Sequence, residues 1–298
     1  MRQKFSVLLL LLLVGSRGFG MEPTDRNMLL KRNSPVVQSF DSLATLSIGN
    51  GGFAMNVDPT GLQTFPDRYT LGNELITQSD WAIRHLGIIG FELPQTTTMA
   101  DFSDVMQTLL LNSGLIKCNY TLQENPVSVY TVCHPHRDII ASHIKSSHPI
   151  PIKLCFPYTT KELAPLLWDK NQHHSTRLVS KRNNSAVFKR SIGSDVYYVI
   201  LQWQGNVNIV EKAANYYVIT PDKGHFAFSC EFVSEFSTTF NDILLPTFKE
   251  TAEESTIAWN AFWNGDCLEA FSDSTRQFTR NEEQHLILDC YKAAVLKK

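Results

Sequence analysis

Asp80 and Trp81 are the first neighbouring side chains in this sequence that suggest chemistry on a ligand. An indole ring stacks on apolar ring faces and a carboxylate accepts hydrogen bonds from hydroxyl groups, so this pair could bind a sugar at the edge of a cleft. The alternative is that Asp80 ends a strand while Trp81 packs in the core, and we favour this alternative.

Three candidate metal ligands alternate along another segment, namely His134, His136 and Asp138. On a strand they would share one face and could bind Zn²⁺. The favoured alternative is a turn around Pro135 that leaves the imidazoles in solvent. No metal site is therefore predicted.

The remaining polar clusters indicate no catalytic machinery. His173-His174 lie in a polar loop, and Glu282-Glu283 are adjacent on a predicted helix. Neighbouring helical side chains diverge by about 100°, so the two glutamates are interpreted as acids of a first helical turn. No Ser-His-Asp order, phosphate-binding glycine loop or nucleotide motif is recognised, and no cofactor is expected.

The composition of the chain argues against two classes of binding partner. The 298 residues are 43% hydrophobic and 19% charged, with a net charge of −2 and a pI near 6.5. This balance offers no electrostatic basis for binding nucleic acid or an anionic membrane. The length suffices for one large core or two modest ones.

The N-terminal twenty residues have the form of a secretory signal. Arg2 and Lys4 precede the apolar run Phe5–Val14, and Gly18-Phe19-Gly20 is a small-x-small cleavage site. The apolar run is too short to span a bilayer. Residues 1–20 are therefore predicted to be a signal peptide, and the mature chain, from near Met21, to be secreted and free of the membrane.

Secreted chains can be N-glycosylated, and the sequence contains two potential sites, at Asn119 and Asn183. Around the first, apolar side chains fall on the even positions of residues 116–122. Asn119 should therefore point to the opposite, solvent face of a strand, together with Lys117 and Thr121.

Six cysteines could form up to three disulfides in an oxidising compartment. A turn around Glu124-Asn125-Pro126 would place Cys118 and Cys133 nearly opposite each other, so a cross-strand bridge between them is one prediction. Buried free thiols are the alternative. The cysteine spacing shows no metal-binding pattern.

The passage from Leu46 to Pro66 predicts a β-hairpin. Leu46 and Ile48 alternate with Ser47, and Asn50-Gly51-Gly52 supplies the positive φ angles of a tight turn. Asp58-Pro59-Thr60-Gly61 is a second turn.

From about Arg32 to Glu235 the pattern favours β structure. Apolar runs of strand length are separated by Gly, Pro, Asn and Asp, which is typical of an antiparallel sandwich. Val196–Trp203 is apolar on both faces and should be a central strand. The clearest runs are Leu86–Leu93, Leu115–Leu122, Val127–Cys133, Ile139–Ile144, Ile152–Pro157, Val196–Trp203, Tyr216–Thr220 and His225–Phe232.

After Phe236 the period changes to that of helices. An amphipathic helix is predicted within Asn241–Gly265, with Gly265 as its end. A second is predicted over Thr279–Lys298, where Thr279 and Glu282 form a capping box. Its apolar stripe is expected to be partly exposed, to make this the least ordered helix and to favour self-association. The stripe consists of Leu286, Cys290, Tyr291, Ala294 and Val295.

Several passages resemble, in order, the N-terminal sandwich of six-hairpin (α/α)6 glycosidases, the family 65-like glycoside hydrolases and phosphorylases. They are the "GNG…FA…GLQTF" passage of residues 49–65, "TQS-x-W" at 77–81, "LGxIG" at 86–90, "HPxxD" from His134 onward, "FPY" at 156–158 and "W-x-x-FW" at 259–263. The resemblance implies a mainly β, galactose mutarotase-like antiparallel super-sandwich over residues 22–236, a helical linker over 237–277 and the first helix of a barrel over 278–298. It also implies substrate contacts from Gln78, Asp80 and Trp81.

The sequence departs from this family in two places. Trp81 leads almost at once into the next strand, where relatives have a longer loop, and the chain reaches Lys298 where the catalytic barrel would begin. Inverting cleavage needs two carboxyl groups about 6.5–9.5 Å apart, which barrel loops supply. We therefore expect a glycoside hydrolase-like protein of carbohydrate metabolism that lacks its catalytic barrel. The alternatives are a non-enzymatic carbohydrate-binding or scaffold protein and an unrelated β-sandwich interaction module.

Overall fold

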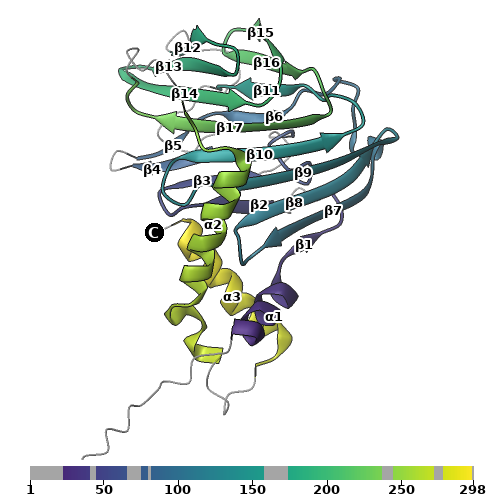
Figure 1. Cartoon of the computed structure of the whole chain (residues 1–298), viewed down its shortest axis with the longest axis vertical. Helices are drawn as coiled ribbons and strands as arrows, with labels where there is room; N and C mark the ends of the chain where they lie inside the picture. Colours follow the sequence, from purple (N-terminus) through teal and green to yellow (C-terminus); the bar gives the residue numbers. More distant parts are fainter. Residues whose placement is uncertain are drawn as a thin grey trace, which may run out of the picture.

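Antiparallel strands form two facing layers, and the three α-helices of the described residues lie largely below them (Figure 1). The computed structural model describes residues 23–40, 45–65, 75–79, 82–157, 174–236, 244–271 and 278–296. The predicted signal peptide and His173 lie outside these residues. The mainly β, antiparallel fold predicted from the sequence is confirmed.

One layer is a nine-stranded sheet in the order β1-β7-β8-β9-β10-β17-β14-β13-β12. Its strand β14, predicted to be central, is the seventh of the nine and is covered on both faces: Leu201 packs in the main core, while Ile200 joins a second cluster with Val187 and Leu245. The sheet comprises β1 (Val36–Val37), β7 (Phe102–Leu110), β8 (Leu115–Leu122), β9 (Asn125–Cys133), β10 (Ile139–Ser146), β12 (His174–Lys181), β13 (Ser185–Ile192), β14 (Asp195–Trp203) and β17 (His225–Val233).

The other layer consists of two four-stranded sheets, β15-β16-β11-β6 and β2-β3-β4-β5. Every run predicted as a strand contains one, and the predicted Leu46 hairpin is β2–β3. The strands are β2 (Leu46–Gly49), β3 (Phe53–Val57), β4 (Leu75–Ser79), β5 (Ala82–His85), β6 (Ile88–Phe91), β11 (Ile152–Cys155), β15 (Val207–Ala213) and β16 (Tyr216–Pro221).

Two of the three helices were predicted from the sequence. Helix α2 (Phe248–Trp263) begins later than predicted, because Thr247 caps it after Pro246 and forms a capping box with Glu250. Helix α3 (Arg280–Val295) begins at the predicted Thr279 cap, and Thr279 and Glu282 form the expected capping box. Helix α1 (Pro23–Asn33) was not predicted. Short 3₁₀ turns lie at Met99–Asp101 and Asp266–Phe271.

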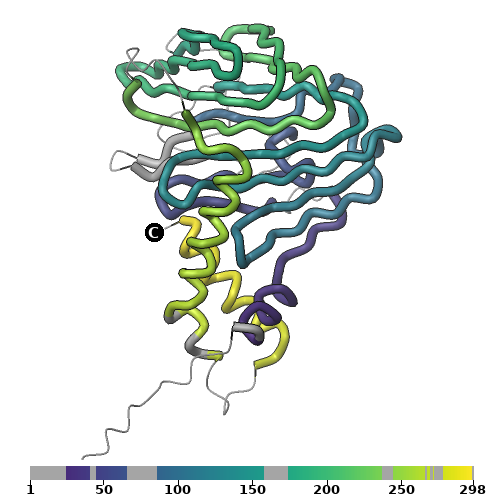
Figure 2. The backbone as a smooth tube through the Cα atoms, in the orientation of Figure 1, coloured from purple at the N-terminus to yellow at the C-terminus, as the bar shows by residue number. Residues whose placement is uncertain are grey.

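Helix α3 returns to the sandwich and ends beside β2, as the backbone trace shows (Figure 2). The Val295 carbonyl accepts a hydrogen bond from Gly51 N at 3.1 Å. Tyr291 is 2% exposed, donates to the Ser47 carbonyl at 3.0 Å and stacks on Trp259 with ring centroids 4.6 Å apart. The expectation of an exposed apolar stripe was therefore wrong for Tyr291 and Val295, because the hairpin and α2 cover them.

An ion pair joins α3 to α1. The guanidinium of Arg32 donates from Nε to Glu283 Oε1 at 2.8 Å and from a second nitrogen to Glu283 Oε2 at 2.5 Å, and Asn33 also donates to Glu283. These hydrogen bonds, led by that of Arg32, hold the pKa of Glu283 below its usual value. Glu282 thus caps helix α3, while Glu283 forms the ion pair that joins α3 to α1.

The predicted Cys118–Cys133 disulfide is wrong, because both residues are buried free thiols. The β8–β9 turn is centred on Gln123-Glu124, whose φ angles are 47° and 68°, and this register places Cys118 opposite Val129. Cys133 is four residues further along, or about 14 Å at 3.4 Å per residue. The disulfide that forms links Cys267 to Cys290 and ties α3 to the turn after α2.

We expect Tyr291→Ala to lower the free energy of unfolding by about 3–5 kcal/mol, as for other buried aromatic residues. Leu286→Ala is the matched control on the same helix, because Leu286 is 39% exposed, and it should cost less than about 1 kcal/mol. Urea unfolding of the two variants measures the difference. Equal, small effects would show that α3 does not rest on the sandwich core.

Candidate functional site

The residues predicted to bind substrate are only partly described. Asp80 and Trp81 lie outside the described residues, and Gln78 is in β4, where its backbone pairs with Ile83 of β5. A site must therefore be sought among the other described side chains, beginning with the loop that follows β3.

Residues 58–64 form a polar turn that is buried throughout. Asp58, 0% exposed, accepts hydrogen bonds from Thr60 N at 2.8 Å, Thr60 Oγ1 at 2.6 Å and Phe65 N at 2.9 Å. Burial raises the pKa of Asp58, while these donors, led by the Thr60 hydroxyl, oppose the increase. The carboxylate thus takes the place of water for the turn's own backbone.

This turn is joined to both layers of the sandwich. Gln107 of β7 donates to the Asp58 carbonyl at 2.7 Å, and Thr131 of β9 donates to the Gly61 carbonyl at 2.6 Å. Gln63 N donates to the Ile89 carbonyl in β6 at 2.7 Å. Gly90 of β6 permits this approach, because a Cβ there would lie 2.3 Å from the Gln63 carbonyl oxygen.

Beyond the turn lies a cavity of about 600 Å³ over the outer face of the β15-β16-β11-β6 sheet. Thr64 and Phe65 form one side, and the turn after β6, residues 92–97, forms another. The sheet contributes Lys153 and Cys155 from β11, Tyr216 from β16, and Lys212 and Ala213 from β15. Ile152 and Leu154 alternate with Lys153 and face the core instead.

One carboxylate organises the polar side of this cavity. Glu92 accepts hydrogen bonds from Lys212 on one oxygen and from the Tyr216 hydroxyl on the other. Burial and the Glu92 contact both raise the pKa of Tyr216, so the phenol keeps its proton and donates it. Among the described lining residues Glu92 is the only carboxylate.

A second cation lies on the neighbouring strand. Lys153 Nζ donates to the Thr64 carbonyl at 2.7 Å, and no ion pair of Lys153 occurs within the described part of the chain. Burial raises the pKa of the adjacent Cys155 thiol to about 12, so this thiol stays neutral. The cavity thus offers hydrogen-bonding groups, aromatic rings and positive charge, without a poised nucleophile.

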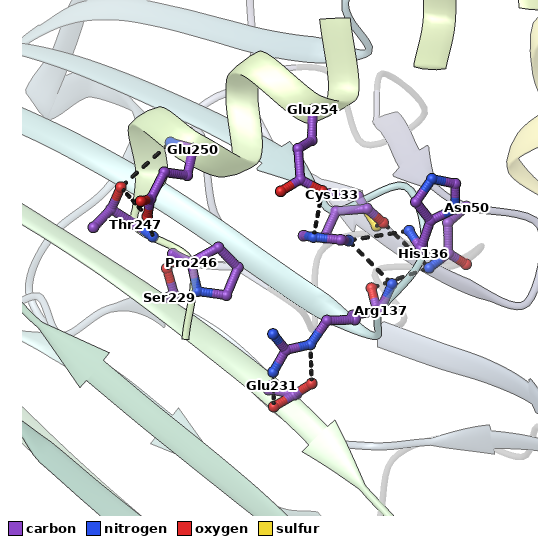
Figure 3. Close-up of polar contacts among 11 residues, drawn as sticks. Asn50, Cys133, His136, Arg137, Ser229, Glu231, Pro246, Thr247, Glu250 and Glu254 are labelled. Atoms are coloured by element: carbon purple, nitrogen blue, oxygen red, sulfur yellow. Dashed lines mark hydrogen bonds and ion pairs between the residues drawn. The ribbon is translucent and has the colours of Figure 1, made fainter. Parts of the chain in front are cut away.

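A separate polar cluster joins the sandwich to α2 (Figure 3). Asn50, in the β2–β3 turn, donates to the carbonyls of His134 at 3.3 Å and Arg137 at 3.1 Å. The Arg137 guanidinium makes two hydrogen bonds to Glu231 of β17, at 2.8 and 2.9 Å. We call this cluster, together with His134 and Glu254, the helix joint.

His134 is a structural member of the helix joint. Its Nδ1 accepts from the backbone N–H groups of His136 and Arg137 at 3.0 and 3.1 Å, so the proton of the neutral ring is on Nε2, 3.0 Å from Glu254 of α2. The expectation of a solvated imidazole is therefore wrong for His134, which is 5% exposed, whereas His136 is exposed. Within the described part of the chain, no three His, Cys, Asp or Glu side chains gather as metal ligands.

Sequence reasoning missed the cavity residues Glu92, Lys153, Lys212 and Tyr216. The available signal was Lys153 itself, a lone cation in the otherwise apolar run Ile152–Phe156. Glu92, Lys212 and Tyr216 lie far from Lys153 in the sequence, and the pairing of β6, β11, β16 and β15 brings the four residues to one cavity.

No family model and no curated protein sequence matches the chain. Its fold is similar to several solved structures, at 10–11% identity and TM-scores below 0.5. A putative kojibiose phosphorylase from the human microbiome has 11% identity and a TM-score of 0.38, and the match covers 92% of this chain and 37% of that one.

A family GH92 α-mannosidase from Bacteroides thetaiotaomicron has 10% identity and a TM-score of 0.41, covering 86% of this chain and 39% of that one. A bacterial glucoamylase complexed with acarbose has 11% identity and a TM-score of 0.43, covering 80% and 40%. The chain thus spans about two fifths of the length of these proteins, and such likenesses assign it no activity.

None of the helices among the described residues combines the length and the apolar character that a membrane span requires.

The helix joint should make stability depend on pH. Burial, above all, lowers the pKa of His134, so the unfolded chain takes up this proton at a higher pH than the folded chain does. The contribution of His134 is thus present above its usual pKa of about 6.5 and is lost as the pH falls through the lower folded value. His134→Asn keeps an acceptor near the Nδ1 position but cannot titrate.

We expect the variant to be less stable than the wild type by about 1–2 kcal/mol at neutral pH, from the lost contact with Glu254. This difference should shrink between pH 7 and pH 5. Chemical unfolding across that range measures it, and a constant or growing difference would contradict the assigned protonation of His134.

Proposed function

We propose that this chain is a glycoside hydrolase-like protein that binds carbohydrate in the cavity beside β6, β11, β15 and β16. The observation that carries the proposal is the composition of this cavity, in which aromatic rings and polar groups from separate elements face a common space. Its volume of about 600 Å³ falls in the usual range of roughly 300–1,000 Å³ for small-ligand sites.

The lining suits the chemistry of a sugar. Sugar rings have apolar faces that pack on aromatic side chains, and Phe65 and Tyr216 supply such rings. Sugar hydroxyl groups need donors and acceptors together, which the side chains of Gln95 and Thr97 provide. Tyr216 is held by its strand and by its hydrogen bond to Glu92, so little ordering of this ring is needed when a ligand binds.

The passages that resemble glycosidases supply further support. Thr64 and Phe65 end the "GLQTF" passage, Gly90 ends "LGxIG", and Cys155 directly precedes "FPY". Arg190 holds this last passage in place by donating to the Pro157 carbonyl at 3.0 Å. The "GLQTF" passage therefore lines the proposed site directly, while the other two passages adjoin the lining residues Phe91 and Cys155.

The cavity favours binding over bond cleavage. Inverting glycosidases need two carboxyl groups in separate roles, whereas both oxygens of Glu92 are occupied by Lys212 and Tyr216. A non-enzymatic carbohydrate-binding protein is the second candidate, and the occupied state of Glu92 is the observation that favours it.

Secretion and glycosylation belong to the same proposal. Asn183 is exposed in the turn between β12 and β13, where a glycan would meet no neighbouring strand. Asn119 lies on the outer side of β8, as expected from its alternation, and accepts a hydrogen bond from Ser128 at 2.8 Å. We infer that both asparagines are glycosylation sites of an exported protein.

A glycan array followed by calorimetry tests the binding proposal. Ala213 is exposed at the rim of the cavity, so Ala213→Trp should fill the cavity without disturbing the core. We expect it to weaken binding of any glycan recognised by the wild type by at least about tenfold, or 1.4 kcal/mol.

Ala261→Trp is the matched control, because Ala261 is an exposed residue of α2 and does not line the cavity. This control should bind as the wild type does. Absence of glycan binding by the wild type, or equal weakening by both substitutions, would refute the assignment of the cavity.

A further inference from the structure

We propose that the cavity selects an acidic saccharide, whose carboxylate or sulfate group pairs with Lys153. This inference rests on the carbohydrate-binding function proposed above and adds the charge of the sugar. The described lining of the cavity contains three charged side chains, namely the ammonium groups of Lys153 and Lys212 and the carboxylate of Glu92. The inference follows from how these three groups are paired.

The negative charge of the cavity is already neutralised. Glu92 has a side chain only 15% exposed, and it pairs with Lys212 while it accepts the Tyr216 hydroxyl. Both Glu92 oxygens are therefore turned toward these partners. At Glu92 a ligand would therefore meet a carboxylate that already has its hydrogen-bond donors.

Lys153 has no such partner among the described residues. Its ammonium group has three N–H donors, of which the Thr64 carbonyl takes one. Among the described residues no carboxylate pairs with it, and the neighbouring Cys155 is held neutral by burial. The remaining donors and the full charge of Lys153 are available to a ligand in the cavity.

The surrounding backbone keeps this ammonium group in place. Lys153 pairs with Gly90 of β6, and the missing side chain at Gly90 lets the 63–65 segment lie over the sheet. The Thr64 carbonyl thereby comes within 2.7 Å of Lys153 Nζ. A cation fixed in a partly buried position attracts an anion more strongly than a mobile surface lysine does, because less entropy is lost and less water intervenes.

Matched oligosaccharides test the inference. Calorimetry would compare trisaccharides of galacturonate, glucuronate and mannuronate with their carboxyl-reduced neutral counterparts, and sulfated disaccharides would form a separate arm. We expect the wild type to bind at least one acidic class about tenfold more tightly than its neutral counterpart, or by 1.4 kcal/mol. The preference should decline between about 0.05 and about 0.3 M NaCl, as screening increases.

Lys153→Met should abolish this preference, so that the ratio of the affinities for the acidic and the neutral form falls to about one, whereas Lys153→Arg should retain it. Lys249→Met, at an exposed position of α2, is the control for lost positive charge, and thermal unfolding checks that each variant is folded. Equal affinity for acidic and neutral forms would overturn the inference while the proposed function stands. Absence of binding to either form would overturn both.

Discussion

The buried carboxylate of Asp58 is the interaction on which the rest of the sandwich depends. It satisfies the backbone N–H groups of Thr60 and Phe65 inside the molecule, where no water is needed to reach them. The turn that it stabilises makes hydrogen bonds to β7, β9 and β6. Without an internal acceptor at this position, the N–H groups of Thr60 and Phe65 would lack this partner, at a cost of about 1–3 kcal/mol for each one that stays buried.

The same constraint explains the glycines around the turn. Gly61 has a φ of 90°, and a Cβ at this residue would lie 2.6 Å from the Val129 side chain. Gly90 is needed for the close approach of Gln63, described above. Gly61 and Gly90, which both belong to the resembling passages, thus serve the packing of the turn, and Thr64 and Phe65 at its end line the cavity.

Much of the fold follows from local patterns in the sequence. Alternation predicted the strands, and the capping boxes at Thr247 and Thr279 begin the two predicted helices, although only the second was recognised in advance. These features depend on residues within a few positions of each other. Helix α1 lacked such a signal, because its sequence has no pronounced apolar stripe and is held by the contacts of Arg32 and Asn33 with Glu283.

The errors concern contacts between distant residues. A shift in the centre of one turn, from Asn125 to Gln123-Glu124, was enough to separate Cys118 from Cys133. The Cys267–Cys290 bridge depends on how α3 folds back, which spacing alone does not determine. The cavity is the clearest case, because Glu92, Lys153 and Lys212 come from three strands or turns whose order in the sheet, β15-β16-β11-β6, differs from their order in the chain.

The helix joint and the cavity differ in how their charged groups are paired. On this ground we interpret the helix joint as structural and the cavity as a binding site. In the helix joint the cation Arg137 pairs with Glu231, and the neutral ring of His134 donates to Glu254. Such closed pairs fix the position of α2 but leave little for a ligand. In the cavity the one carboxylate of the described lining, Glu92, pairs with Lys212, while Lys153 is held by a carbonyl that has only partial charge. An uncompensated cation contributes little to the stability of a fold and incurs a desolvation cost. Its presence on an otherwise apolar strand is therefore better explained by a negatively charged ligand than by folding.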